Sequence, residues 1–362
     1  MLFAGEAALI YFLRKWYERH FSHPEALLLL VLILSTSFTL AFFGKMLAPI
    51  LAALVIAYLL EASVNYLERK RLGRILAVTL VFLMFLAVFV FLVIGLAPVF
   101  SRQLATFLQE LPYMVSQGRE LLVRLPELYP NFVTTDQIDS LTEDTIGFAS
   151  ALGQSALTLS LASIPVMITV LVYLVLGPVL VFFFLKDKHS LIAWLKSFLP
   201  ADRKVLNVVW ADVDAQIGNY IRGKFYEIFI VGTVTYVTFW LLSVSYAPLL
   251  AVAVGLSVIV PYIGAAVITI PVALAAYIQF GFGADFASVI VAYGVIQALD
   301  GNLLVPLLFS DVVSLHPIAI IASVLLFGGL WGFWGVFFAI PLATLVKSVL
   351  KAWPSSPDLG PT

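Results

Sequence analysis

Cysteine is absent from this sequence of 362 residues, and charged side chains are scarce. Without a thiol the chain forms neither a disulfide framework nor a thiolate metal site. Its four histidines show no metal-ligand spacing, so the sequence predicts no metal centre and no cofactor. Only 11% of the residues are charged, whereas an ordinary soluble domain carries roughly 25%. This scarcity excludes a typical soluble protein.

Apolar residues take the place of the missing charges, at 62% of the chain and a mean hydropathy of +1.07. Stretches such as Ala26 to Phe43, Ile75 to Val99 and Leu157 to Leu185 approach or exceed the ~18 to 20 residues that a helix needs to cross a bilayer. The first run follows three basic residues but lacks a convincing cleavage site, so we expect a retained helix and not a signal peptide. The sequence predicts an all-α polytopic membrane protein.

The positions of the basic residues predict how the chain crosses the membrane. Under the positive-inside rule, the N-terminus, the 67–74 loop, the 186–224 segment and the C-terminus are cytoplasmic. These parts hold 16 of the 20 Lys and Arg residues. Segment 101–155, which has more acidic than basic residues, is then periplasmic.

About six full spans are expected, of which the first four lie near residues 26–43, 46–66, 75–99 and 157–185. The predicted domains follow in chain order: an interfacial N-terminal helix at 1–25, transmembrane helices at 26–100, a periplasmic helical domain at 101–155, a fourth span at 156–185, cytoplasmic interfacial helices at 186–224, a span with a first hairpin at 225–284, a broken span with a second hairpin at 285–352, and a cytoplasmic tail at 353–362.

A weak internal repeat in the second half of the chain predicts two helical hairpins. Pro248 and Pro317 each open an apolar run that breaks at glycine and ends on an Ile-Pro motif, at Pro271 and Pro341. An arm of about 12 residues reaches only ~18 Å, short of a full crossing. We therefore expect two re-entrant hairpins related as an inverted repeat, with tilted, fully spanning arms as the alternative. The expected tip residues are Pro261, Tyr262, Gly264, Gly328, Gly329, Gly332 and Gly335.

Polar residues interrupt the span before the second hairpin, at Gln297, Asp300 and Asn302. A carboxylate at the centre of a membrane helix costs at least ~2.5 kcal/mol and should face a cavity or a partner. Gly301 and Pro306 weaken the helix and would free backbone groups for a solute or a cation. The nearest basic residues in sequence lie outside this run, at Arg222 and Lys224. The structural alternative is that Asp300 caps a broken helix and is satisfied by backbone.

The motif Gln216–Lys224 is the second dense polar segment. Its basic residues are expected to anchor a helix end at the inner leaflet. No P-loop, nucleophile elbow or His-Glu metal signature is present in the sequence, so we expect a secondary transporter and not an enzyme. His316 is expected to be a helix-boundary residue. The hinge and entry candidates are Gly218, Asn219, Arg222, Gly223, Pro306, His316 and Pro317.

These motifs resemble those of the autoinducer-2 exporter family, especially its PerM-like permease branch. The resemblance rests on Gly218–Lys224, Val260–Gly264, Gln297–Asn302, Leu315–Pro317 and the glycine-rich run 328–335. It implies a homo-oligomeric transporter of a bacterial inner membrane.

Three functions stay open. The first is export of a small organic solute such as autoinducer-2, coupled to a cation or proton gradient. The second is sodium or lithium/proton antiport through Asp300. The third is a membrane scaffold without transport. Sodium or a proton is the expected coupling ion, lipid is the expected surrounding, and no nucleic-acid partner is expected.

Overall fold

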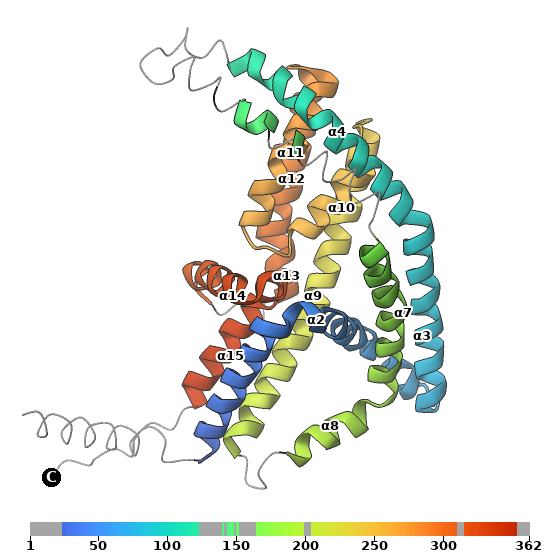
Figure 1. The fold of residues 1–362 in the computed structure, drawn as a ribbon, viewed down its shortest axis with the longest axis vertical. Coiled ribbons are helices and arrows are strands. Elements are labelled where there is room, and N and C mark those ends of the chain that lie inside the picture. The colour runs from blue at the N-terminus through green and yellow to red at the C-terminus, as the bar shows by residue number, and fades with distance from the viewer. Residues whose placement is uncertain are drawn as a thin grey trace, which may run out of the picture. The chain divides into compact units, whose positions relative to one another are not determined.

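The structure is a computed structural model that describes residues 24–122, 164–198, 204–309 and 315–352, with a few positions between 140 and 151. The regular elements in these ranges are helices (Figure 1). The predicted N-terminal helix before residue 24, part of the predicted periplasmic segment and the tail after residue 352 lie outside the described residues. The elements are α2 (Pro24–Arg69), α3 (Arg74–Phe91), η1 (Leu92–Leu96), α4 (Ala97–Leu122), α7 (Ile164–Lys186), α8 (Lys188–Ser197), α9 (Lys204–Leu241), α10 (Ala247–Ser257), α11 (Ile263–Phe280), α12 (Ala284–Leu299), η2 (Asp300–Leu304), α13 (Val305–Phe309), α14 (Pro317–Phe337) and α15 (Ala339–Ala352).

Several described helices are long and apolar enough to cross a membrane. Large apolar side chains stay exposed along them, for example Phe42 at 70% and Ile75 at 73%. Such continuous apolar surface is suited to lipid and not to water. The sequence prediction of an all-helical membrane protein with several spans is therefore confirmed. Within the described residues the five candidate spans are Ser35–Arg69, Arg74–Tyr113, Ile263–Phe280, Ala284–Phe309 and Pro317–Phe337, with a sixth if the bent pair Val170–Lys186 and Lys188–Ser197 is one span.

Two predicted helix boundaries are wrong. α2 runs as one helix through residues 44 and 45, between the first two predicted spans. Only Gly44 and Lys45 interrupt the apolar run there, and both residues can adopt helical backbone. The third predicted span does not end at Val99 either, because α3 continues through the π-helical turn η1 into α4. Polar residues from Ser101 onward end the apolar run without ending the helix.

The chain divides into two compact units, which are described separately. The first unit comprises Met1–Ala52, Asp187–Ile221 and Asp311–Thr362, and contains the second predicted hairpin. The second unit comprises Ala53–Lys186 and Arg222–Ser310, and contains the first predicted hairpin and the polar residues around Asp300.

The largest core of the second unit packs α9, α10, α11 and α12 together, with Phe107 of α4 joining from the side. α4 crosses α10 and α11 (Figure 1) and is tied to α10 by two side chains. Gln103 accepts a hydrogen bond from the Leu249 amide at 3.1 Å, and the Tyr246 hydroxyl donates to Glu110 at 2.7 Å. Burial and the neighbouring Glu110 raise the pKa of Tyr246 to about 12, so the phenol stays a donor at neutral pH.

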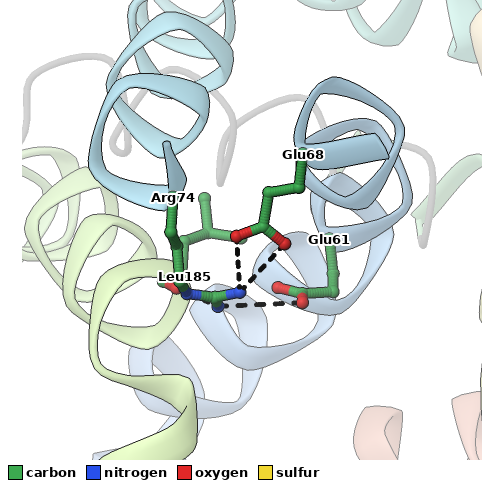
Figure 2. Close-up of polar contacts among 4 residues, drawn as sticks. All are labelled: Glu61, Glu68, Arg74 and Leu185. Carbon is green, nitrogen blue, oxygen red and sulfur yellow. Dashed lines mark hydrogen bonds and ion pairs between the residues drawn. The ribbon is translucent and has the colours of Figure 1, made fainter. Parts of the chain in front are cut away.

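A smaller core of the second unit packs α2, α3 and α7, and Arg74 closes one end of it (Figure 2). The Arg74 guanidinium donates to the Leu185 carbonyl of α7 at 2.9 Å. It also lies 3.4 Å from Glu68 and 3.8 Å from Glu61, both on α2. One side chain of α3 therefore links the preceding helix, α2, to α7, which is distant in sequence.

The first predicted hairpin is present, with α10 and α11 as its arms. The chain reverses between Val258 and Tyr262, where Tyr262 takes a left-handed φ of 62°. Gly264 then packs directly on the returning arm, because a Cβ there would lie 1.8 Å from the Ser257 carbonyl oxygen. α10 has 11 residues and is too short to span, whereas α11 has 18 and is long enough. Re-entrant and spanning layouts therefore both stay open.

The second predicted hairpin reverses at Gly332, inside α14. The backbone leaves the helix there with φ 61° and ψ −136°. A Cβ on Gly335 would lie 1.8 Å from the Phe327 carbonyl oxygen, so the chain doubles back on itself. The length of α14 is that of a full span, but this close approach rules out a straight helix through Gly332. Gly328 and Gly329 belong to the incoming arm.

Candidate functional site

A buried ion pair on α9 forms the centre of the candidate site. Lys224 and Glu227 are one helical turn apart and only 4% and 2% exposed. The Lys224 ammonium donates to the Glu227 carboxylate with an Nζ–Oε2 distance of 2.6 Å. At a spacing of i to i+3 the two side chains share one face of the helix. Each charge is therefore removed from solvent and compensated by the other.

Lys224 also holds the first hairpin. Its ammonium donates a second hydrogen bond, of 2.7 Å, to the carbonyl of Val258, directly after α10. The ring of Phe309 lies over the same ammonium at 5.3 Å. Gly223 leaves space for this ring, since a Cβ there would lie 2.7 Å from a Phe309 ring carbon. The sequence thus places a small residue beside Lys224 so that an aromatic ring can cover it.

Asp300 and Gln297 bring further polar atoms to the second unit from α12 and η2. Both side chains are partly buried, and the Asp300 Oδ1 and Gln297 Nε2 atoms have no hydrogen-bond partner. Asp300 lies within electrostatic range of both Lys224 and Glu227. An unpartnered acceptor and an unpartnered donor three residues apart are costly unless something else occupies them.

The helix around Asp300 is distorted but not broken, which corrects the predicted break. Residues Asp300–Leu304 form one π-helical turn, in which the Val305 amide donates to the Asp300 carbonyl. The cause is Pro306, which has no N–H and so removes one donor from the turn. Asn302 does not join the cluster, because its exposed side chain donates to the Ala298 carbonyl at 2.8 Å.

The cluster formed by these three side chains has more acidic groups than basic ones. Lys224 supplies one positive group, whereas Glu227 and Asp300 supply two carboxylates. Among the residues that the structure describes, no group of three His, Cys, Asp or Glu side chains is arranged to hold a metal ion. The atom that the arrangement leaves without a hydrogen-bond partner on the acidic side is the Asp300 Oδ1.

Sequence reasoning missed two members of this cluster. Lys224 was expected at the lipid surface as an anchor, and that expectation is wrong because its side chain is buried. Glu227 is not among the residues that the sequence analysis singles out. The available signal was the i to i+3 spacing of Lys224 and Glu227 on a helix that continues into apolar sequence.

Other predicted residues lie in the first unit or at helix ends. His316 caps α14, where its Nδ1 accepts a hydrogen bond from the Ile318 amide at 3.3 Å, and Pro317 opens the helix. This supports the interpretation of His316 as a boundary residue.

Gly218 and Asn219 lie on the part of α9 that belongs to the first unit. Beside them Tyr220 donates to the Phe337 carbonyl at 2.7 Å, which fastens the second hairpin to α9. Pro261 and Arg222 belong to the second unit.

Comparison with known proteins covers almost the whole chain. A model of the AI-2E family of transporters matches residues 27–355. PerM of Escherichia coli (strain K12), whose name proposes a permease, is 44% identical over 342 residues, covering 94% of this chain and 97% of PerM. YueF of Bacillus subtilis (strain 168), whose name proposes a transport protein, is 24% identical over 314 residues, covering 85% and 84%. The chain therefore belongs to the AI-2E family of transporters.

Proposed function

We propose that this protein is a secondary transporter in which Asp300 binds a proton and a monovalent cation in turn. The observation that carries the proposal is the second acidic group of the cluster, Asp300, whose Oδ1 atom has no hydrogen-bond partner while Lys224 pairs with Glu227. A carboxylate oxygen that is buried without a hydrogen-bond partner is unfavourable, and either a proton or a cation would satisfy it. Two ligands that neutralise the same group compete for it, which is what exchange across a membrane requires.

The donor atoms favour a small, hard cation. The unpartnered atom is a carboxylate oxygen, and hard cations prefer oxygen ligands. Pro306 has no N–H, so the turn before it has one amide donor fewer and would leave a backbone carbonyl oxygen for a cation. Sodium or lithium is therefore the expected partner of the proton.

Lys224 couples ligand binding at Asp300 to the first hairpin. The same ammonium pairs with Glu227 and holds the Val258 carbonyl. Because Asp300 lies within electrostatic range of Lys224, a ligand that neutralises Asp300 changes the field acting on that ammonium. Binding or release of a proton or cation at Asp300 would thereby strengthen or weaken the hydrogen bond from Lys224 to the Val258 carbonyl, at the end of α10.

A second candidate function is export of a small organic solute such as autoinducer-2. The observation in its favour is the unpartnered amide donor of Gln297, three residues from the unpartnered acceptor of Asp300. A donor and an acceptor side by side suit a solute that carries hydroxyl groups. In this case proton or cation binding would drive release of the solute.

Flux in proteoliposomes tests the proposal. Purified protein is reconstituted in vesicles with an acidic lumen and an internal pH dye, and sodium or lithium is added outside. We expect the internal pH to rise with the wild-type chain and with Asp285→Asn, and to stay at the empty-vesicle level with Asp300→Asn. Asp285 is the matched control because it is an exposed acid in the first turn of the same helix, α12.

Other outcomes separate the candidates. An unchanged flux in Asp300→Asn would overturn the role given to Asp300. A flux that is equally large when potassium replaces sodium and lithium would contradict a site for small, hard cations. Accumulation of a labelled hydroxylated solute, with no proton movement when the solute is left out, would favour organic export over antiport.

A further inference from the structure

An apolar groove lies between α2 and α3, in the second unit. It has a volume of about 460 Å³, within the ~300 to 1,000 Å³ range of ligand pockets. The groove is open on the protein surface, where Tyr66, Leu80 and Met84 are all more than half exposed. Its lining is almost wholly apolar, formed by Ala62, Ser63, Tyr66 and Leu67 of α2 and by Leu80, Val81 and Met84 of α3.

A basic loop stands at one end of this groove. Ala62, Tyr66 and Lys70 follow one another at helical spacing, so Lys70 continues the face of α2 that lines the groove. The Lys70 ammonium lies over the Tyr66 ring, 4.7 Å from its centroid. Arg69 and Arg71 flank it, and all three side chains are exposed. Lys70, at the end of the groove, thus contacts Tyr66, which is one of the residues that line the groove.

The acidic residues nearby do not neutralise this loop. Glu61 and Glu68 both lie within ion-pair distance of the Arg74 guanidinium (Figure 2). In the part of the chain that the structure describes, Lys70 and Arg71 have no carboxylate within 4 Å. Their positive charge is therefore free for an anion from outside the chain.

The distance along α3 from its first residue, beside the basic loop, to the groove residue Met84 fits one leaflet of a bilayer. At about 1.5 Å per residue, the α3 backbone from Arg74 to Met84 covers about 15 Å. Half of a ~30 Å hydrocarbon core has the same thickness. A molecule with an anionic head at Lys70 and an apolar chain along Leu80 and Met84 would lie as a phospholipid lies in its leaflet.

We infer that the α2–α3 groove is a binding site for an anionic phospholipid. The headgroup phosphate contacts Lys70 and Arg71, and one acyl chain occupies the groove beside Tyr66. Charge complementarity selects the anionic lipid over a zwitterionic one, because basic residues at a membrane surface attract anionic headgroups. The site is separate from the exchange proposed for Asp300.

Native mass spectrometry of delipidated protein tests this inference, with phosphatidylglycerol and phosphatidylcholine as probes. We expect phosphatidylglycerol to bind several-fold more tightly. Lys70→Gln is expected to weaken its binding about fivefold, the effect of one basic residue near an anionic surface, while phosphatidylcholine binding stays unchanged. Ala62→Leu, which fills the groove, is expected to weaken both lipids.

Lys186→Gln is the matched control. Lys186 is also an exposed lysine at the end of a helix, 5.8 Å from the centroid of the Phe183 ring, but it does not border the groove. It should leave lipid binding unchanged. Equal binding of the two lipids, or equal effects of Lys70→Gln and Lys186→Gln, would overturn the site.

A covalent readout does not depend on how well the variants fold. Wild-type protein is irradiated with a phosphatidylglycerol that carries a photoreactive group in one acyl chain, and the modified peptides are mapped. We expect cross-links within residues 62–84. Cross-links spread evenly over the exposed helices, with no enrichment in that range, would refute the inference.

Discussion

At the scale of single residues, Lys224 is the side chain that connects the elements of the candidate site. Its ammonium group contacts the Glu227 carboxylate, the Val258 carbonyl and the Phe309 ring. These partners come from α9, the first hairpin and α13. The site therefore depends on one buried ammonium group that contacts three elements.

We expect Lys224→Met to destabilise the protein strongly, because it leaves Glu227 buried without its counter-charge. Removing one partner of a buried pair typically costs about 3–5 kcal/mol. Replacing both partners by apolar residues is often close to neutral, so Lys224→Met combined with Glu227→Leu should recover most of the loss. Thermal unfolding of the purified protein in detergent, followed by tryptophan fluorescence, measures both effects.

The exposed lysine at position 186 provides the comparison, and Lys186→Met should leave the unfolding midpoint within error of wild type. If Lys224→Met had no larger effect than this control, the buried pair would not be structural.

Asp300 is easier to recognise as a candidate site residue from the sequence than Lys224 and Glu227 are. Asp300 stands alone in a long apolar run, so the cost of a charge in lipid marks it immediately. Lys224 and Glu227 stand where the charged segment 186–224 meets the apolar one, and there a basic residue is ordinarily a surface anchor. Only the packing of α10 and α13 around α9 reveals that Lys224 is buried.

At the scale of elements, both hairpins reverse by the same device. A residue with φ near 60°, Tyr262 in one and Gly332 in the other, is followed within three positions by a glycine that packs on a carbonyl of the incoming arm. Neither Gly264 nor Gly335 has space for a side chain. The arms of each hairpin are thus in contact at the turn itself.

We predict that Gly264→Ala separates the arms of the first hairpin. The added Cβ would lie 1.8 Å from the Ser257 carbonyl oxygen, and backbone must shift to relieve the clash. Overpacking of this kind typically costs about 1–3 kcal/mol, which a lower unfolding midpoint would report. Gly294→Ala on α12 has open space around it and should be neutral or stabilising, because alanine is the better helix former. Equal midpoints for the two variants would refute this packing.

The element types follow well from the sequence, whereas their junctions do not. Proline and glycine marked both hairpins correctly, because few other residues permit such reversals. The turn expected at Gly44 and Lys45 is absent, since a polar interruption alone does not stop a helix. The break expected at Gly301 is a π-helical turn, which absorbs Pro306 while the helix continues.

At the scale of the whole molecule, the distribution of basic residues predicts the orientation in the membrane. The chain has no cysteine, so one introduced thiol reports on one position. We expect Ser116→Cys, on α4, to react with a membrane-impermeant maleimide in intact cells. Ser197→Cys, on α8, should react only after permeabilisation.

The two serines are matched, because both are exposed and both donate to the carbonyl three residues earlier. The unmodified chain should stay unlabelled. Labelling of Ser197→Cys in intact cells would invert the predicted topology.

The family and the helical class were accessible from sequence, because composition and spaced motifs carry them. The two compact units were not, since each joins segments that are distant in the chain. The inverted repeat predicted for the hairpins concerns their placement in the membrane, and it stays a prediction.

The single surplus acidic group of the cluster also determines how the membrane potential would act on the proposed exchange. If Asp300 carries one proton in one direction and one sodium ion in the other, no net charge crosses the bilayer in a complete cycle. Such a cycle is electroneutral, and the membrane potential neither drives nor opposes it. The concentration ratios of the two ions alone would then set the direction of transport. A carrier with this stoichiometry would continue to work in a depolarised cell.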